Sequence, residues 1–153
     1  MDRLEIIRLG PGDSARFAAM NALFAEVFGD PQSYASNPPR ANYRDSLLGD
    51  ERIVLLLAER EGDPVGALAA YELRKFEQER SEFYLYDLAT RSPYRRQGVA
   101  RALVDALRQI ARENGGWMIF VQSDTQPEDG PALAFYRSIA AFEEQPVHFD
   151  IAP

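Results

Sequence analysis

The sequence predicts a mixed α/β fold, in which helices flank one central sheet. Two apolar strands are joined by the turn Glu61-Gly62-Asp63, which predicts an antiparallel hairpin. An amphipathic helix between two further strands predicts a parallel strand–helix–strand unit. The chain has 153 residues, a length that fits a single domain, residues 1–153, with a buried core.

The N-terminal third predicts one strand followed by two helices. Leu4–Leu9 is a short, largely apolar segment that favours a strand. Ser14–Phe28 repeats apolar side chains at helical spacing, and Gly29 ends the pattern. Tyr34–Pro39 predicts a loop, and Tyr43–Leu48 predicts a short helix before Gly49.

The remaining two thirds alternate between strand and helix patterns. Val99–Glu113 has one apolar stripe and one charged side, and Pro131–Ile139 is also helical in spacing. Five segments read as strands: Ile53–Glu59, Pro64–Leu73, Glu82–Thr90, Trp117–Gln122 and Phe142–Ile151. The predicted order is therefore strand, two helices, three strands, helix, strand, helix, strand.

Charge and composition narrow the classes of ligand. The formal net charge is −7, which argues against a nucleic-acid partner and suits a cationic small molecule. With no cysteine and one histidine, His148, neither a Cys-ligated zinc site nor an acyl-cysteine intermediate is possible, and we expect no metal. No apolar run approaches the ~18 residues of a membrane span, and no secretory signal is visible, so we expect no membrane partner and a cytoplasmic location.

The segment between the predicted strand Glu82–Thr90 and the predicted helix Val99–Glu113 indicates an anion site. The start of a helix has unpaired N–H groups and a partial positive charge, and both attract phosphate. Gly98 lets the backbone approach a ligand closely, and Arg95, Arg96 and Arg101 add positive charge to an otherwise acidic chain. The pattern is neither a P-loop nor a dinucleotide fingerprint. A solvated basic helix start is the alternative reading.

This segment, Arg95-Arg96-Gln97-Gly98-Val99-Ala100, resembles the Arg/Gln-x-x-Gly-x-Gly/Ala signature of the GNAT acetyltransferases. The resemblance implies a GNAT fold and acetyl-CoA as the co-substrate. It implies that backbone amides of Arg95 through Ala100 hold the pyrophosphate of acetyl-CoA. It also implies that the preceding strand diverges from its neighbour, so that Leu88 and Ala89 pair with pantetheine through their main chains.

Other stretches resemble the type I aminoglycoside 3-N-acetyltransferases, the gentamicin-resistance group. The similarity runs from about Phe24 to Ile151. It is based on Phe28-Gly29-Asp30 with Tyr34, Gly66-Ala67-Leu68-Ala69-Ala70-Tyr71, Lys75-Phe76-Glu77-Gln78, Arg80-Ser81-Glu82, Tyr84-Leu85-Tyr86-Asp87-Leu88-Ala89 and His148-Phe149-Asp150-Ile151. The resemblance implies acetyl transfer to the 3-amino group of a 2-deoxystreptamine aminoglycoside, and the superfamily suggests a homodimer.

Three residues are candidates for the chemistry, which must remove a proton from an ammonium group before the amine attacks a thioester. Strand alternation predicts Phe83, Leu85, Asp87 and Ala89 on one face, and a carboxylate among apolar neighbours needs a partner or a task. The resemblance places Asp87 beside the acceptor amine, as a base or as an electrostatic anchor. A structural aspartate bonded to backbone N–H groups is the alternative.

His148 is the second candidate base because the ordinary pKa of histidine, ~6.5, suits neutral pH. Tyr136 is the third candidate: many GNAT enzymes have a tyrosine in this helix that protonates the CoA thiolate. A structural histidine and a core aromatic residue are the alternatives. Glu82, Asp124, Glu128, Asp129 and Asp150 are candidates for binding further ammonium groups of the acceptor. Tyr84 and Tyr86 are expected on the face opposite Asp87, either as core residues or as a wall for a sugar.

Three functions compete. The first is aminoglycoside 3-N-acetyltransferase, with direct transfer from acetyl-CoA. The second keeps the chemistry but uses a polyamine or a peptide amine. The third is a non-catalytic acyl-CoA-binding module, which would have no need of Asp87 and Tyr136.

Overall fold

The computed structural model describes residues 3–153, which fall into two compact units. The first, here called the sheet unit, spans Met1–Val121, and the second, the C-terminal unit, spans Gln122–Pro153.

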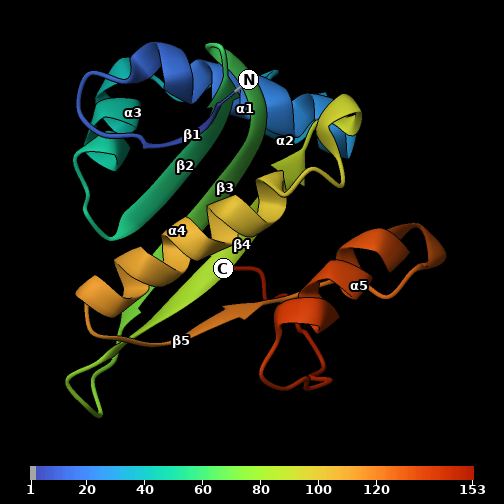
Figure 1. The fold of residues 1–153 in the computed structure, drawn as a ribbon. Helices are drawn as coiled ribbons and strands as arrows, with labels where there is room; N and C mark the ends of the chain where they lie inside the picture. Colours follow the sequence, from blue (N-terminus) through green and yellow to red (C-terminus); the bar gives the residue numbers. More distant parts are fainter. Residues whose placement is uncertain (1–2) are drawn as a thin grey trace. The chain divides into compact units, whose positions relative to one another are not determined.

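The sheet unit is built on a five-stranded sheet in the order β1-β2-β3-β4-β5 (Figure 1). The neighbouring pairs from β1 to β4 are antiparallel, and the pair of β4 and β5 is parallel. The predicted mixed sheet is thereby confirmed. The strands are β1 Leu4–Arg8, β2 Ile53–Arg60, β3 Asp63–Arg74, β4 Ser81–Thr90 and β5 Gly116–Val121.

One face of the sheet is covered by the N-terminal helices α1 Ser14–Phe28, α2 Pro31–Tyr34 and α3 Ala41–Leu48. Phe24 of α1 is fully buried in a cluster that includes Ala67, Ala69 and Ala89 of the sheet. The small alanine side chains leave room for a large aromatic ring to pack on the strands.

The helix α4, Val99–Glu113, lies across the other face (Figure 1). It begins and ends at the predicted residues, and its apolar stripe is the buried side of the helix. Leu103 and Leu107 are fully buried, as are Leu56 of β2 and Leu68 of β3. This packing fixes the start of α4 beside the end of β4.

The short helix α2 was not expected. The sequence predicts a loop from Tyr34, whereas Tyr34 is the last residue of α2. The physical reason is a pair of helix-start signals: the Asp30 side chain accepts a hydrogen bond from the Ser33 N–H at 3.0 Å, and Pro31 occupies the first turn.

The C-terminal unit contains a 3₁₀ helix, η2 Pro127–Asp129, and the helix α5, Gly130–Ile139. The prediction of a strand over Phe142–Ile151 is wrong, since residues 140–153 form no strand. A strand needs hydrogen bonds from a neighbouring strand, and this unit contains none. Its alternating apolar residues, among them Val147, Phe149 and Ile151, are exposed.

None of the helices in residues 3–153 combines the length and the apolar character needed to span a bilayer.

Candidate active site

A β-bulge in β4 controls which side chains share a face. Asp87 pairs with Ala69, but the next residue of β3, Ala70, pairs with Leu85, so Tyr86 is an extra residue without a partner of its own. Because alternate residues of β3 point to opposite faces, Asp87 and Leu85 lie on opposite faces of the sheet.

The predicted grouping of Phe83, Leu85, Asp87 and Ala89 on one face is therefore wrong. Ala89 belongs to the core on the α1 side and shares that face with Asp87, whereas Phe83 and Leu85 are buried on the other face. Simple alternation fails here because the bulge shifts the pattern by one residue.

Asp87 is a half-buried carboxylate with one strong partner. The Tyr34 hydroxyl donates a hydrogen bond to its Oδ2 at 2.7 Å. Burial raises the pKa of Asp87 above its ordinary value because it removes water from the charged form, and the Tyr34 hydrogen bond opposes this effect. Its other oxygen, Oδ1, has no hydrogen-bond partner among residues 3–121.

Three tyrosines form an aromatic surface beside Asp87. We call Tyr71, Tyr84 and Tyr86 the tyrosine surface. The Tyr86 ring meets the rings of Tyr71 and Tyr84 edge to face, with centroids 5.6 Å apart in both cases. Tyr84 also stacks on Phe120 of β5 at 4.6 Å.

The position of Tyr84 corrects a second expectation. The sequence places Tyr84 on the face opposite Asp87, but Tyr84 pairs with Tyr71, which alternates onto the face of Ala69 and Asp87. Tyr71 and Tyr86 are 40% and 55% exposed, so the tyrosine surface is open to a ligand on the side where Asp87 lies.

The end of β4 has a free edge. The pairing of β4 with β5 stops at Leu85 and Val121, yet β4 continues to Thr90. Leu88 and Ala89 lie in this continuation, so β5 does not use the backbone groups on that side of them. An extended chain can hydrogen-bond to such an edge.

The segment Arg95–Ala100, which we call the arginine turn, follows β4 and a short 3₁₀ helix, η1 Ser92–Tyr94. Arg96 and Gly98 have positive φ angles of 61° and 83°. No side chain caps α4, which begins at Val99. The first N–H groups of a helix have no intrahelical partner, so this turn presents backbone donors and the positive helix end together.

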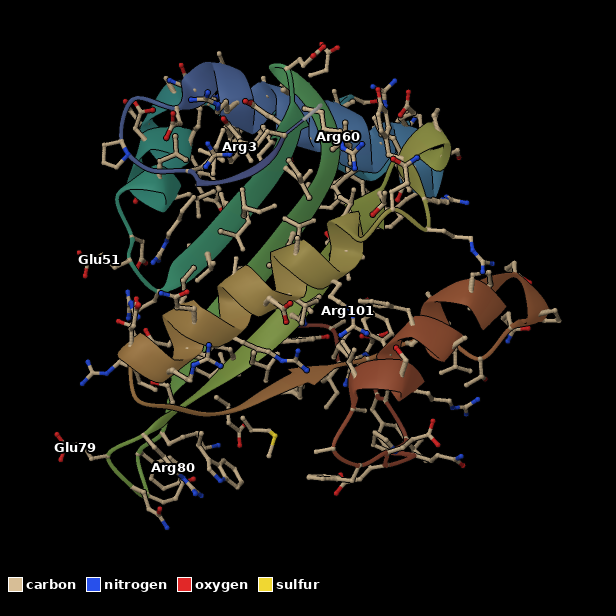
Figure 2. The ribbon with its side chains drawn as sticks, in the orientation of Figure 1. Arg3, Glu51, Arg60, Glu79, Arg80 and Arg101 are labelled. Atoms are coloured by element: carbon tan, nitrogen blue, oxygen red, sulfur yellow. The ribbon has the colours of Figure 1, made fainter. Side chains whose placement is uncertain are left out.

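The side chains of the arginine turn leave that backbone open. Arg95, Arg96 and Gln97 are exposed, and the Gln97 amide donates back to the Pro93 carbonyl at 2.9 Å. Arg101 lies in the first turn of α4 and is also exposed (Figure 2). The combination of open backbone amides with three arginines can bind a polyphosphate.

Gly66 of β3 was not among the predicted site residues. A Cβ atom there would lie 2.6 Å from Cγ1 of Val99 and 3.1 Å from the Ala89 carbonyl oxygen. Glycine at this position therefore allows the start of α4 to approach the end of β4. The sequence gives only a weak signal for this, a glycine inside a strand pattern.

Glu82 lies on the same side of β4 as Tyr84, since it pairs with Leu73, two residues beyond Tyr71. Its carboxylate is 3.8 Å from the Lys75 ammonium. Glu82 is thus neutralised in part and is a weaker candidate for an ammonium site than Asp87.

The other predicted site residues belong to the C-terminal unit. Tyr136 lies in α5 next to Phe135, with ring centroids 5.6 Å apart. His148 Nε2 and Asp150 Oδ1 are 2.8 Å apart, and both side chains are exposed. Asp124 is exposed between β5 and η2.

Among residues 3–153 there is no group of three or more His, Cys, Asp or Glu side chains that can hold a metal ion.

Comparisons with known proteins agree with this geometry. Residues 17–142 match the model of the acetyltransferase (GNAT) family. The chain thus belongs to the GNAT family, whose enzymes use acetyl-CoA, and it is an acetyl-transferring enzyme. No curated protein matches the chain.

Two solved structures of aminoglycoside acetyltransferases, both from uncultured soil metagenomic samples, are similar to this chain. The first has 43% sequence identity and a TM-score of 0.95, with 99% of each chain covered. The second, in complex with sisomicin, has 33% identity and a TM-score of 0.89, with 98% of this chain and 96% of that chain covered. An aminoglycoside N-acetyltransferase bound to CoA, at 15% identity, TM-score 0.78 and coverage of 99% and 96%, shows the fold alone.

Proposed function

We propose that this enzyme acetylates an aminoglycoside at the 3-amino group of its 2-deoxystreptamine ring. The observation that carries the proposal is the half-buried Asp87 carboxylate, which lies beside the tyrosine surface at the point where β4 becomes free of β5. The 43% identity with an aminoglycoside acetyltransferase supports this acceptor class.

Acetyl-CoA binds along the end of β4 in this proposal. Leu88 and Ala89 pair with pantetheine through their backbones, and the arginine turn holds the pyrophosphate. The thioester then lies near Asp87, one residue before Leu88. An amine that reaches Asp87 is therefore close to the carbon it must attack.

The acceptor meets a surface suited to a cationic sugar. A carboxylate attracts an ammonium group, and exposed tyrosine rings attract cations and pack against the apolar faces of sugar rings. Tyr71 and Tyr86 are exposed enough to do both. We assign further ammonium groups of the acceptor to Glu82, Asp124 and Asp150.

The transfer is direct, because the chain has no cysteine to form an acyl-enzyme. Asp87 accepts a proton from the bound ammonium, and the freed nitrogen attacks the thioester carbon. The C–S bond breaks as the tetrahedral intermediate collapses, and the CoA thiolate takes a proton from Tyr136. The nitrogen loses its second proton in this step, which restores neutral Tyr136, and Asp87 releases the first proton to solvent. His148 is the alternative base.

We further propose that the enzyme forms a homodimer, as the superfamily resemblance suggests, and that it works in the cytoplasm. Light scattering of the purified protein tests the first of these proposals.

The acceptor experiment compares three amines at equal concentration: gentamicin, spermidine and a peptide with a free amine. We expect acetyl-CoA turnover to be fastest with gentamicin, and NMR of the product to place the acetyl group on the 3-amino nitrogen. Acetylation at the 6′-amine would correct the regiospecificity, and faster turnover of spermidine or the peptide would replace the acceptor class.

A further inference from the structure

We propose that Tyr34 is a positioning residue for Asp87, which makes α2 part of the acceptor side of the active site. This inference rests on the proposed function, in which Asp87 meets the acceptor amine. The two residues are 53 positions apart in the chain, and their side chains meet in a 2.7 Å hydrogen bond.

The geometry gives the two carboxylate oxygens different tasks. Oδ2 accepts the Tyr34 hydrogen bond, and Oδ1 has no partner among residues 3–121. A carboxylate held by one oxygen cannot rotate freely about its last side-chain bond. The second oxygen is therefore held in one orientation, in which it can receive the ammonium group of the proposed acceptor.

The electrostatics give Tyr34 a second effect. Burial raises the pKa of Asp87, and the Tyr34 hydrogen bond is the interaction that lowers it. The pKa of Tyr34 is itself raised far above its ordinary value, by burial first and then by Asp87, so its hydroxyl remains a neutral donor over the working pH range. Tyr34 therefore keeps Asp87 in its charged, proton-accepting form to a lower pH.

The ring of Tyr34 is fixed independently of its hydroxyl. It packs against Phe24 and Phe28 of α1, with ring centroids 5.6 Å and 5.7 Å away. Phe24 is fully buried, so one side of the Tyr34 ring packs against the core. Replacing Tyr34 with phenylalanine consequently removes the hydrogen bond and keeps the packing.

The first test is a carboxyl ¹³C NMR titration of aspartate-labelled protein without ligands, in which the Asp87→Asn variant identifies the Asp87 resonance. We expect Tyr34→Phe to raise the pKa of Asp87 by about one unit, the size expected for loss of one hydrogen bond to a charged group. Tyr43→Phe is the control, since Tyr43 is 64% exposed on α3. An unchanged Asp87 pKa in Tyr34→Phe would overturn the electrostatic role.

The second test is kinetic. We expect Tyr34→Phe to lower kcat by about tenfold in the wild-type background and by less than twofold in the Asp87→Asn background, because its effect passes through Asp87. Equal losses in both backgrounds would mean that Tyr34 has a general structural role and would overturn the proposal. If Asp87→Asn alone is fully active, the role of Asp87 in the proposed function fails and this inference fails with it, whereas an active Tyr34→Phe beside an inactive Asp87→Asn contradicts only this inference.

Discussion

In the proposed function, the groups that meet a ligand at the arginine turn are backbone amides of one continuous segment, whereas beside Asp87 they are side chains from separate elements. Gly98 and the start of α4 are neighbours in the sequence. Asp87 comes from β4, Tyr34 from α2 and Tyr71 from β3. A backbone site depends on local conformation, and a side-chain site depends on how the elements pack.

This difference has a consequence for substitutions. Most side-chain substitutions in the arginine turn leave the directions of its backbone amides unchanged. A change in the φ angles at Arg96 or Gly98 alters those directions. Around Asp87, by contrast, the side chains themselves are the contact groups, so a substitution changes the site even where the backbone is unchanged. The bulge in β4 decides which of these side chains share a face. Substitutions at Asp87 and at Gly98 therefore separate the two regions.

The largest effect is expected at Asp87. Asp87→Asn preserves the size of the side chain and its ability to accept from Tyr34, but removes its basicity and charge. We expect kcat with gentamicin to fall by about 10²–10⁴-fold, the usual contribution of a general base, while acetyl-CoA affinity is unchanged. If Asp87 only anchors the ammonium, KM should rise and kcat should fall less.

The control for this variant is Asp105→Asn, on the exposed side of α4. It removes the same charge away from β4 and should leave both constants near the wild-type values. Near-normal kcat and KM in a folded Asp87→Asn enzyme would contradict both roles and make His148 the leading base.

The next effect is expected at the arginine turn. Gly98 has φ +83° and no atom within 4 Å of an added Cβ, so Gly98→Ala strains the backbone without a steric clash in the free protein. We expect acetyl-CoA to bind about tenfold more weakly, equivalent to ~1.4 kcal/mol, because the amides lose their alignment and the Cβ faces the ligand. Isothermal titration calorimetry measures this affinity.

Gly62→Ala is a matched control. Gly62 has φ +86° and also has no atom within 4 Å of an added Cβ, but it lies in the turn between β2 and β3. Both variants should lose similar stability, and only Gly98→Ala should lose acetyl-CoA affinity. Equal affinities in the two variants would remove the arginine turn from the co-substrate site.

The same contrast explains what could be predicted from the sequence. The boundaries of α1 and α4 follow from apolar spacing and helix-end residues, which are local signals. The arginine turn was predictable for the same reason, because its glycine and arginines stand between a strand pattern and a helix pattern.

The contacts of Asp87 were not predictable in this way. No local pattern shows the extra residue at Tyr86, because a bulge is visible only in the pairing with β3. The Tyr34–Asp87 hydrogen bond joins elements that are distant in sequence. The strand predicted at Phe142–Ile151 failed for a related reason, since alternation predicts a strand only where a pairing partner exists.

A smaller effect is expected at the tyrosine surface. Tyr86→Leu removes a ring that is 55% exposed, and Tyr86→Phe retains the ring and removes the hydroxyl. We expect Tyr86→Leu to raise KM for gentamicin by roughly two- to fivefold, the size of an exposed cation–π contact, with little change in kcat. Tyr86→Phe should resemble the wild type. If both variants raise KM equally, the hydroxyl rather than the ring contacts the acceptor.

The smallest effect is expected on stability, and its sign distinguishes a catalytic carboxylate from a structural one. A structural aspartate has a lowered pKa and stabilises the fold at neutral pH. Burial raises the pKa of Asp87 instead, so the folded protein holds this proton more tightly than the unfolded chain, whose aspartates titrate near ~3.9. The contribution of Asp87 to stability is therefore most favourable below pH ~3.9 and is lost as the pH rises through its folded pKa.

We expect Asp87→Asn to melt at most a few degrees above the wild type at pH 7, and the difference in melting temperature to shrink as the pH approaches 4. Asp105→Asn corrects for the loss of one negative charge from a chain of net charge −7. A wild type that is more stable than Asp87→Asn at pH 7, after this correction, would identify Asp87 as a structural residue.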